Sequence, residues 1–139
     1  VLVATRCLAP AGQRVVRTLT SLAESAGRLG VDIEFLSPQG FRSFPLPTYR
    51  SLRLALPPHG EIARRIEASR PDSIHIATEG PIGFLTRAYC RRRGLRFTTS
   101  YTTRFPEYIA ARFAVPESWS YAVLRKFHGA AAATTVATE

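Results

Sequence analysis

Short apolar runs alternate along this chain with segments whose apolar residues recur at helical spacing, and this alternation limits the fold more than any other feature. Runs typical of buried strands lie at residues 1–5, 31–37, 51–56, 73–78, 96–101 and 133–138. Helical periodicity and stop signals predict helices over residues 15–29, 59–69, 81–93, 106–113 and 117–128. Strands that alternate with helices build an α/β fold, so we predict a doubly wound, Rossmann-like parallel sheet in three layers.

The chain has 139 residues, which is enough for one domain with a core and too few for two, so we predict a single domain over residues 1–139. The first ten residues, VLVATRCLAP, lack the features of a signal peptide. The chain begins without Met, on residues that already look like a strand, which suggests a trimmed amino terminus. Cys7 and Cys90 lack metal-type spacing. We therefore expect no zinc site, no disulfide framework and a cytoplasmic protein.

The composition is strongly basic. Nineteen Lys and Arg against 10 Asp and Glu give a formal net charge of +9, which favours acidic partners. These partners include phosphorylated small molecules, an anionic membrane surface and nucleic acid. Aromatic residues are not interleaved with basic ones on any predicted strand face, so nucleic acid is the weakest of the three and we expect none. Peripheral docking on the inner face of the plasma membrane stays open.

In a doubly wound sheet of order 3-2-1-4-5-6, ligands bind outside the carboxyl ends of the strands, where the strand order reverses. The loops that meet there are predicted at residues 6–13, 78–83 and 100–105. Two of them are rich in hydrogen-bonding side chains, and the stretch TSYTTRFPEY (99–108) overlaps the third loop. We therefore expect these loops to form the walls of a ligand crevice.

Glu79 and Gly80 lie where the fourth predicted strand leads into a helix that starts near Pro81. The free backbone amides of such a helix start attract anions or hydroxyl oxygens, and Glu79 is suited to accept hydrogen bonds from sugar hydroxyls or to serve as a base. A carboxylate at this position also complements the helix dipole with no further role. The sequence leaves both interpretations open.

Tyr101 and Arg104 are the candidates in the third loop. The Arg104 guanidinium suits a phosphate or a carboxylate, and the Tyr101 ring suits stacking on a sugar. The structural alternatives are an Arg104–Glu107 surface pair and a Tyr101 ring in the core. Polar residues gather at two predicted strand ends, and this pattern favours the functional interpretation.

Other motifs are weak. A single glycine, Gly12, precedes the first helix without the spacing of a dinucleotide site. The run RRRG (91–94) is typical of a helix end with cations and a glycine cap. His75 is predicted to be a structural strand residue, and His59 and His128 to be capping or plainly exposed residues near helix ends. None of the three has a nearby Cys or His partner, so we expect no metal site.

Several blocks in order carry a family resemblance. The longest is RPDSIHIATEGPIGFLTRAYCRRRGLRFTTSYTTRFPEYIAAR (70–112), and VVRTLTSLAE, LSPQGF, PTYRSLRLAL and YAVLRKFHGAAAATTVAT belong to the same pattern. Together they resemble the amino-terminal domain of glycosyltransferase family four enzymes of the two-domain GT-B fold. The similarity is greatest to the branch of lipid mannosyl- and sulfoquinovosyl-type transferases, and it covers essentially the whole chain.

The resemblance implies a retaining transfer of a hexose from a nucleotide-sugar to a hydroxyl acceptor, without a cofactor or a required metal. The amino-terminal half of such enzymes binds the acceptor, and the carboxy-terminal half binds the nucleotide. This chain would then lack the donor domain and be inactive alone. The resemblance places Glu79, Gly80, Tyr101 and Arg104 at the acceptor, and Gly12, Gln13 and Arg14 at the donor phosphates.

Two positions depart from the family pattern. The family usually has an Asn-Gly pair where this chain has Gln13 and Arg14, and a catalytic His where it has Thr102. An arginine side chain would obstruct a diphosphate or bind it with a guanidinium in place of backbone amides. A threonine cannot replace an imidazole, although it can hydrogen-bond an acceptor. The alternative hypothesis is therefore a catalytically impaired remnant or a binding module with the same fold.

Overall fold

The computed structural model describes residues 1–5, 14–46, 49–101, 110 and 114–136. Its centre is a five-stranded sheet in the order β2-β1-β5-β6-β7, in which every neighbouring pair is parallel. The strands are β1 (Leu2–Ala4), β2 (Glu34–Leu36), β5 (Ile74–Ile76), β6 (Phe97–Tyr101) and β7 (Ala133–Val136). The predicted α/β, Rossmann-like fold is thereby confirmed, and so is the reversal of strand order beside β1.

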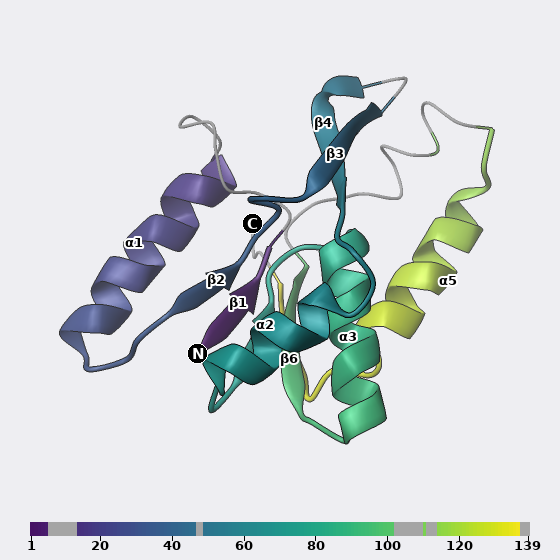
Figure 1. Ribbon diagram of the computed structural model, residues 1–139. Helices are drawn as coiled ribbons and strands as arrows, with labels where there is room; N and C mark the ends of the chain where they lie inside the picture. Colours follow the sequence, from purple (N-terminus) through teal and green to yellow (C-terminus); the bar gives the residue numbers. More distant parts are fainter. Residues whose placement is uncertain (6–13, 47–48, 102–109, 111–113, 137–139) are drawn as a thin grey trace.

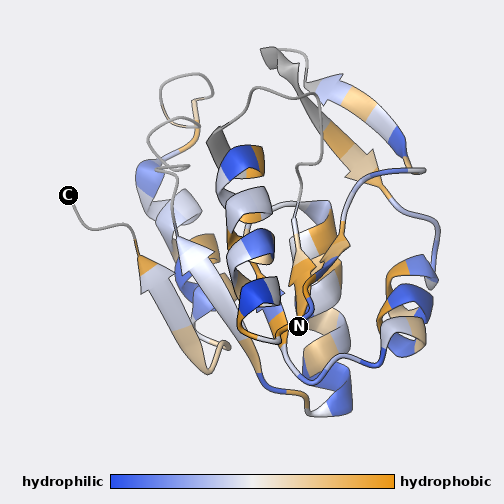
Figure 2. Cartoon of the chain, turned by 90° about the vertical axis from the view of Figure 1, so that its left-hand side faces the viewer, coloured by the Kyte–Doolittle hydropathy of each residue, from blue (hydrophilic) through white to orange (hydrophobic). Residues whose placement is uncertain are grey.

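Helices cover both faces of this sheet (Figure 1). Helix α1 (Arg14–Arg28) lies on one side, and α2 (Glu61–Ser69), α3 (Pro81–Arg93) and α5 (Glu117–His128) lie on the other. The helices carry hydrophilic and hydrophobic residues in turn (Figure 2), as expected for helices with one face on a core. Of the predicted helix at 106–113, only Ala110 is among the described residues.

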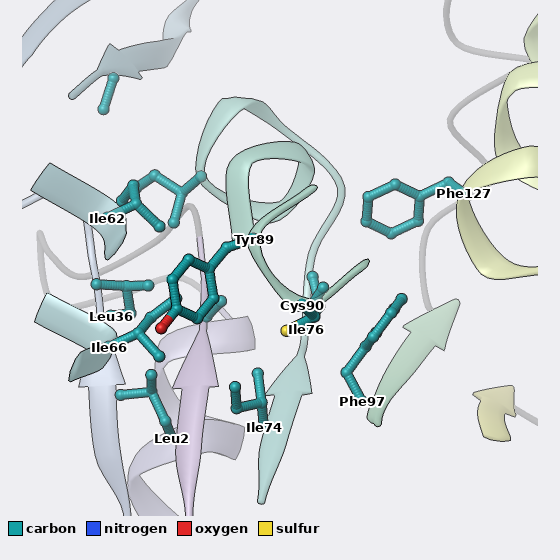
Figure 3. Close-up of a cluster of buried hydrophobic side chains, with 13 residues drawn as sticks. Leu2, Leu36, Ile62, Ile66, Ile74, Ile76, Tyr89, Cys90, Phe97 and Phe127 are labelled. Atoms are coloured by element: carbon teal, nitrogen blue, oxygen red, sulfur yellow. The ribbon is translucent and has the colours of Figure 1, made fainter. Parts of the chain in front are cut away.

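The alternation of side chains along the strands divides the core into two clusters. In β1, Leu2 and Ala4 belong to the cluster under α2 and α3, while Val3 packs with Leu19 of α1 on the opposite face. Ile76 and Phe127 are almost completely buried in the larger cluster (Figure 3). Burial of one such side chain contributes about 1.5–3 kcal/mol to stability.

One predicted strand lies outside the sheet. The run at 51–56, expected as its third strand, belongs to β4 (Tyr49–Leu56), which pairs antiparallel with β3 (Arg42–Leu46) in a separate two-stranded ribbon. The order 3-2-1-4-5-6 is therefore wrong in its first position. The partner strand was missed because Pro45 reads as a strand breaker, yet proline is tolerated at the edge of a ribbon. Pairing with an adjacent segment also closes only a short loop.

The ends of two helices agree with the predictions from turn chemistry. Helix α3 starts at Pro81 and ends before Gly94, whose positive φ of 65° caps it after three arginines. Helix α5 spans the predicted residues. Among the described residues, no helix is long and apolar enough to cross a membrane.

Candidate functional site

The carboxyl ends of β1, β5 and β6 meet at one edge of the sheet. Ala4 of β1 is level with Ile76 of β5, and Ile76 is level with Thr99 of β6. Glu79 follows β5 at this edge, and Tyr101 is the last residue of β6. Helix α1 also starts near this edge of the sheet (Figure 1), and Arg14 is its first residue.

The remaining predicted site residues are Gly12, Gln13, Thr102 and Arg104, and all of them lie outside the described residues. Among the described residues, the structure therefore brings the backbone of Arg14, Glu79 and Tyr101 to one edge of the sheet. The roles assigned to these side chains stay predictions.

The turn between β5 and α3 places Glu79 close to the core. Gly80 has a φ of 151°, a conformation that suits glycine, and it directly precedes the first turn of α3. A Cβ on Gly83 would lie 2.5 Å from the carbonyl oxygen of Thr78, so the missing side chain lets α3 approach the end of β5. The Glu79 side chain is consequently only 8% exposed.

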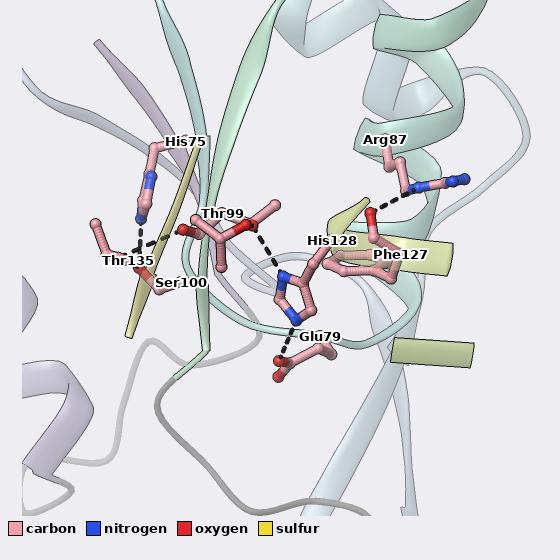
Figure 4. Close-up of polar contacts among 9 residues, drawn as sticks. His75, Glu79, Arg87, Thr99, Ser100, Phe127, His128 and Thr135 are labelled. Atoms are coloured by element: carbon pink, nitrogen blue, oxygen red, sulfur yellow. Dashed lines mark hydrogen bonds and ion pairs between the residues drawn. The ribbon is translucent and has the colours of Figure 1, made fainter. Parts of the chain in front are cut away.

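His128 binds this buried carboxylate (Figure 4). Its Nε2 lies 3.2 Å from Oε1 of Glu79, and its Nδ1 lies 2.8 Å from Oγ1 of Thr99. The Thr99 hydroxyl is 2.9 Å from that of Thr134 on β7, so a continuous chain of polar groups joins Glu79 to the last strand. We call these four residues, Glu79, His128, Thr99 and Thr134, the edge network.

The partners of His128 allow a consistent set of donors and acceptors. The oxygens of an ionised carboxylate only accept hydrogen bonds, so with Glu79 ionised the N–H at Nε2 of His128 is the donor of that bond. With the ring neutral, Nδ1 accepts from the Thr99 hydroxyl, which is free to accept from that of Thr134. Every bond of the edge network has a donor and an acceptor in this arrangement.

Helix α5 is fixed where it carries His128. The Arg87 guanidinium of α3 donates to the carbonyl oxygens of Phe127 and Lys126, at 3.1 and 2.7 Å. These carbonyls lie in the last turn of α5, where a cation also complements the helix dipole. Phe127 is 1% exposed and its ring packs edge-on against Phe84 and the imidazole. His128 is therefore held from both its backbone and its ring.

The prediction that His128 is a capping or plainly exposed residue is wrong. Its side chain is only 13% exposed and reaches a residue 49 positions away in the chain. The histidine belongs to a block that resembles the family, but neither its neighbours nor its helical position signals a buried carboxylate partner. His59 is exposed, as expected.

A second imidazole cluster lies on the opposite face of β6. His75 binds the hydroxyls of Thr98 and Ser100, each at 2.8 Å, and Ser100 is 2.8 Å from the Thr135 hydroxyl. Burial lowers the pKa of His75 below its ordinary value of 6.5. The prediction of a structural strand histidine agrees with this setting, and we call it the strand cluster.

An apolar hollow of about 430 Å³ adjoins the edge network between α5 and β7. The His128 imidazole forms part of its wall, as does the Tyr101 ring, which lies edge-on to the imidazole at 5.7 Å between centroids. The other lining residues come from α5, its C-cap and β7: Tyr121, Leu124, Arg125, Gly129, Thr134 and Val136. The His128 imidazole thus both binds the Glu79 carboxylate at the strand ends and forms part of the apolar wall of the hollow. Among the described residues, no three His, Cys, Asp or Glu side chains are grouped to hold a metal ion.

Comparison with known proteins decides the family. The sequence profile of Glycosyltransferase Family 4 matches residues 15–139, nearly the whole chain. The chain belongs to glycosyltransferase family 4. The family resemblance of the sequence is confirmed, and the parallel α/β sheet agrees with the amino-terminal domain of a GT-B enzyme.

A relative in Arabidopsis thaliana, sulfoquinovosyl transferase SQD2, is 33% identical to this family 4 domain over 112 residues. The match covers 77% of the domain and 22% of the relative, so the domain spans less than a quarter of that protein. No solved structure matches significantly.

Proposed function

We propose that this chain is the acceptor-binding, amino-terminal half of a retaining hexosyltransferase. The full-length enzyme transfers a sugar from a nucleotide-sugar to a hydroxyl group, and a carboxy-terminal domain that is not part of this chain binds the nucleotide. The buried Glu79 carboxylate, held by His128 at the carboxyl edge of the sheet, is the observation that carries the proposal. Ligands of open α/β sheets bind at this edge.

In this proposal Glu79 accepts a hydrogen bond from the acceptor hydroxyl. A carboxylate 8% exposed is strongly desolvated, so a hydroxyl donor gains more there than in water. Gly80 and the first turn of α3 leave backbone amides beside it, and Tyr101 lies at the carboxyl end of the neighbouring strand β6. Thr102 at the reacting sugar, Arg104 at the acceptor and residues 12–14 at the donor phosphates complete the assignment.

The acceptor is a lipid on the cytoplasmic face of the plasma membrane. The apolar hollow beside His128 suits the hydrocarbon part of such an acceptor. The net charge of +9 favours an anionic surface, where each nearby Lys or Arg contributes about 1 kcal/mol. Co-sedimentation with phosphatidylglycerol vesicles should be strong at low salt and weak at high salt. Equal binding to neutral phosphatidylcholine vesicles would contradict a membrane acceptor.

The direct test uses the full-length protein with radiolabelled UDP- and GDP-hexoses and vesicles of diacylglycerol and phosphatidylglycerol. We expect a labelled, chloroform-soluble product. Glu79→Gln should lower kcat/KM for the acceptor about 10- to 100-fold, because a hydrogen bond to a charged group contributes about 1.5–3 kcal/mol. Glu24→Gln, on helix α1, is the matched control and should transfer sugar normally. No transfer to any hydroxyl acceptor would refute the proposal.

The departures at Gln13, Arg14 and Thr102 favour a second candidate, a catalytically impaired remnant. Arg14→Gly and Thr102→His restore the family residues in the full-length protein. A large gain in transfer by the double variant would support the remnant. Equal rates for the unmodified and restored proteins would exclude it.

A further inference from the structure

The carboxylate of Glu79 ends the edge network at the carboxyl edge of the sheet. Among the described residues, this carboxylate is bonded through Oε1 alone, to His128 at 3.2 Å. The desolvation of a buried carboxylate is costly unless several donors surround it, and one imidazole supplies a single donor. Its second oxygen is therefore suited to a donor from a ligand.

The position of that second oxygen depends on His128. The imidazole binds Oε1 on one side and the fully buried Thr99 hydroxyl on the other, so rotation of the ring would break two hydrogen bonds at once. The rings of Tyr101 and Phe127 stand edge-on to it at 5.7 and 5.1 Å and block its displacement sideways. The ring direction is thus fixed from four sides.

The Thr99 hydroxyl keeps this arrangement intact in both charge states of the imidazole. A hydroxyl rotates to donate to a neutral Nδ1 or to accept from a protonated one, and Thr134 adjusts in the same way behind it. In both states Nε2 donates to Glu79.

We propose that His128 is a positioning residue of the acceptor site. It holds Oε1 of Glu79, with Thr99 fixing its far nitrogen, so that the second carboxylate oxygen receives the acceptor hydroxyl. This inference rests on the proposed function. It assigns to a helix-end histidine a role in acceptor recognition, whereas the donor is bound elsewhere.

The test is a mutant cycle in the full-length protein, with a radiolabelled hexose donor and diacylglycerol vesicles as the probe acceptor. His128→Ala should lower kcat/KM for the acceptor about 10- to 100-fold and change KM for the nucleotide-sugar less than twofold. His128→Gln keeps an amide donor near Nε2 and should recover activity to within about fivefold of the wild type. The control is His59→Ala, an exposed histidine outside the edge network, which should change neither constant.

The decisive comparison is with Glu79→Gln. If His128 acts through Glu79, the double variant Glu79→Gln/His128→Ala should be no slower than Glu79→Gln alone. Additive losses, or equal losses in His128→Ala and His128→Gln, would overturn the inference. If His128→Ala does not fold, Thr99→Val replaces it in the same cycle.

The two proposals fail in different ways. A wild-type enzyme that transfers sugar, with a His128→Ala variant as active as His59→Ala, refutes the positioning role alone. A wild-type enzyme that transfers no sugar refutes the proposed function and the inference with it.

Discussion

The edge network and the strand cluster contain the same chemistry on opposite faces of β6, yet only one of them includes a carboxylate. In both, a histidine has hydrogen-bond partners at both ring nitrogens, and threonine hydroxyls of β6 supply one of them. His75 stands in the middle of a parallel strand and binds hydroxyls only. His128 stands at the end of a helix and reaches the strand ends, where Glu79 lies (Figure 4). Position relative to the sheet edge therefore separates a structural imidazole from a candidate functional one.

The largest expected effect comes from removing the ring of Phe127, which packs against His128 of the edge network. Phe127→Ala deletes a ring that is 1% exposed and packs against the imidazole, and should lower the free energy of unfolding by about 3–5 kcal/mol. Denaturant unfolding measures this loss. Trp119→Ala on the same helix, where the side chain is 69% exposed, should change stability by less than about 0.5 kcal/mol. Similar losses in the two variants would show that α5 is not anchored through Phe127.

A smaller effect distinguishes the two faces of β6. Thr99→Val keeps the shape but removes the partner of His128 Nδ1 at a position where Thr99 is fully buried and water has no access, which should cost about 1–3 kcal/mol. Thr98→Val removes the corresponding partner of His75, whose side chain is only half-buried, and water replaces the lost hydroxyl there. Urea denaturation should therefore give a lower free energy of unfolding for Thr99→Val than for Thr98→Val. The reverse order would mean that the strand cluster is the more tightly closed of the two.

The dependence of stability on pH tests the strand cluster. Because burial lowers the pKa of His75 below 6.5, the unfolded chain binds more protons than the folded one between the folded pKa and 6.5. Stability should fall as the pH drops through this window, by at most about 1.4 kcal/mol per pH unit from this group. In His75→Gln, the free energy of unfolding should depend less on pH than in the wild type over the range just below pH 6.5. A variant curve parallel to the wild type would contradict the direction of the shift.

The smallest expected change concerns the exposed end of the strand cluster. Thr135 lies on β7, which is exposed along its whole length, and its hydroxyl bonds the Ser100 hydroxyl at 2.8 Å and the Thr99 carbonyl oxygen at 3.4 Å. Water takes the place of the hydroxyl for both partners when it is removed. Thr135→Val should change the free energy of unfolding, measured by urea denaturation, by no more than a surface substitution does, about 0.5 kcal/mol or less. A larger loss would show that His75 depends on this last hydroxyl.

The elements were predictable where local chemistry defines them. Pro81 and Gly94 bound α3 because a fixed φ suits the first helical turn and a positive φ suits the cap. The ribbon of β3 and β4 was not predictable in the same way, since Pro45 removes a donor that an edge strand does not require. The placement of Glu79 at the strand ends followed from the topology of parallel sheets. That topology did not predict that His128 is the hydrogen-bond partner of Glu79.

Apart from β3, the sequence by itself determined the described strands and helices, because periodicity fixes the direction of side chains within each element. It also determined membership of glycosyltransferase family 4. Only the tertiary structure decided that His128 meets Glu79, 49 positions away, because that contact depends on how α3 and α5 pack across β6. Packing of this kind is a sum of many weak long-range contacts, and no single residue along the chain encodes it.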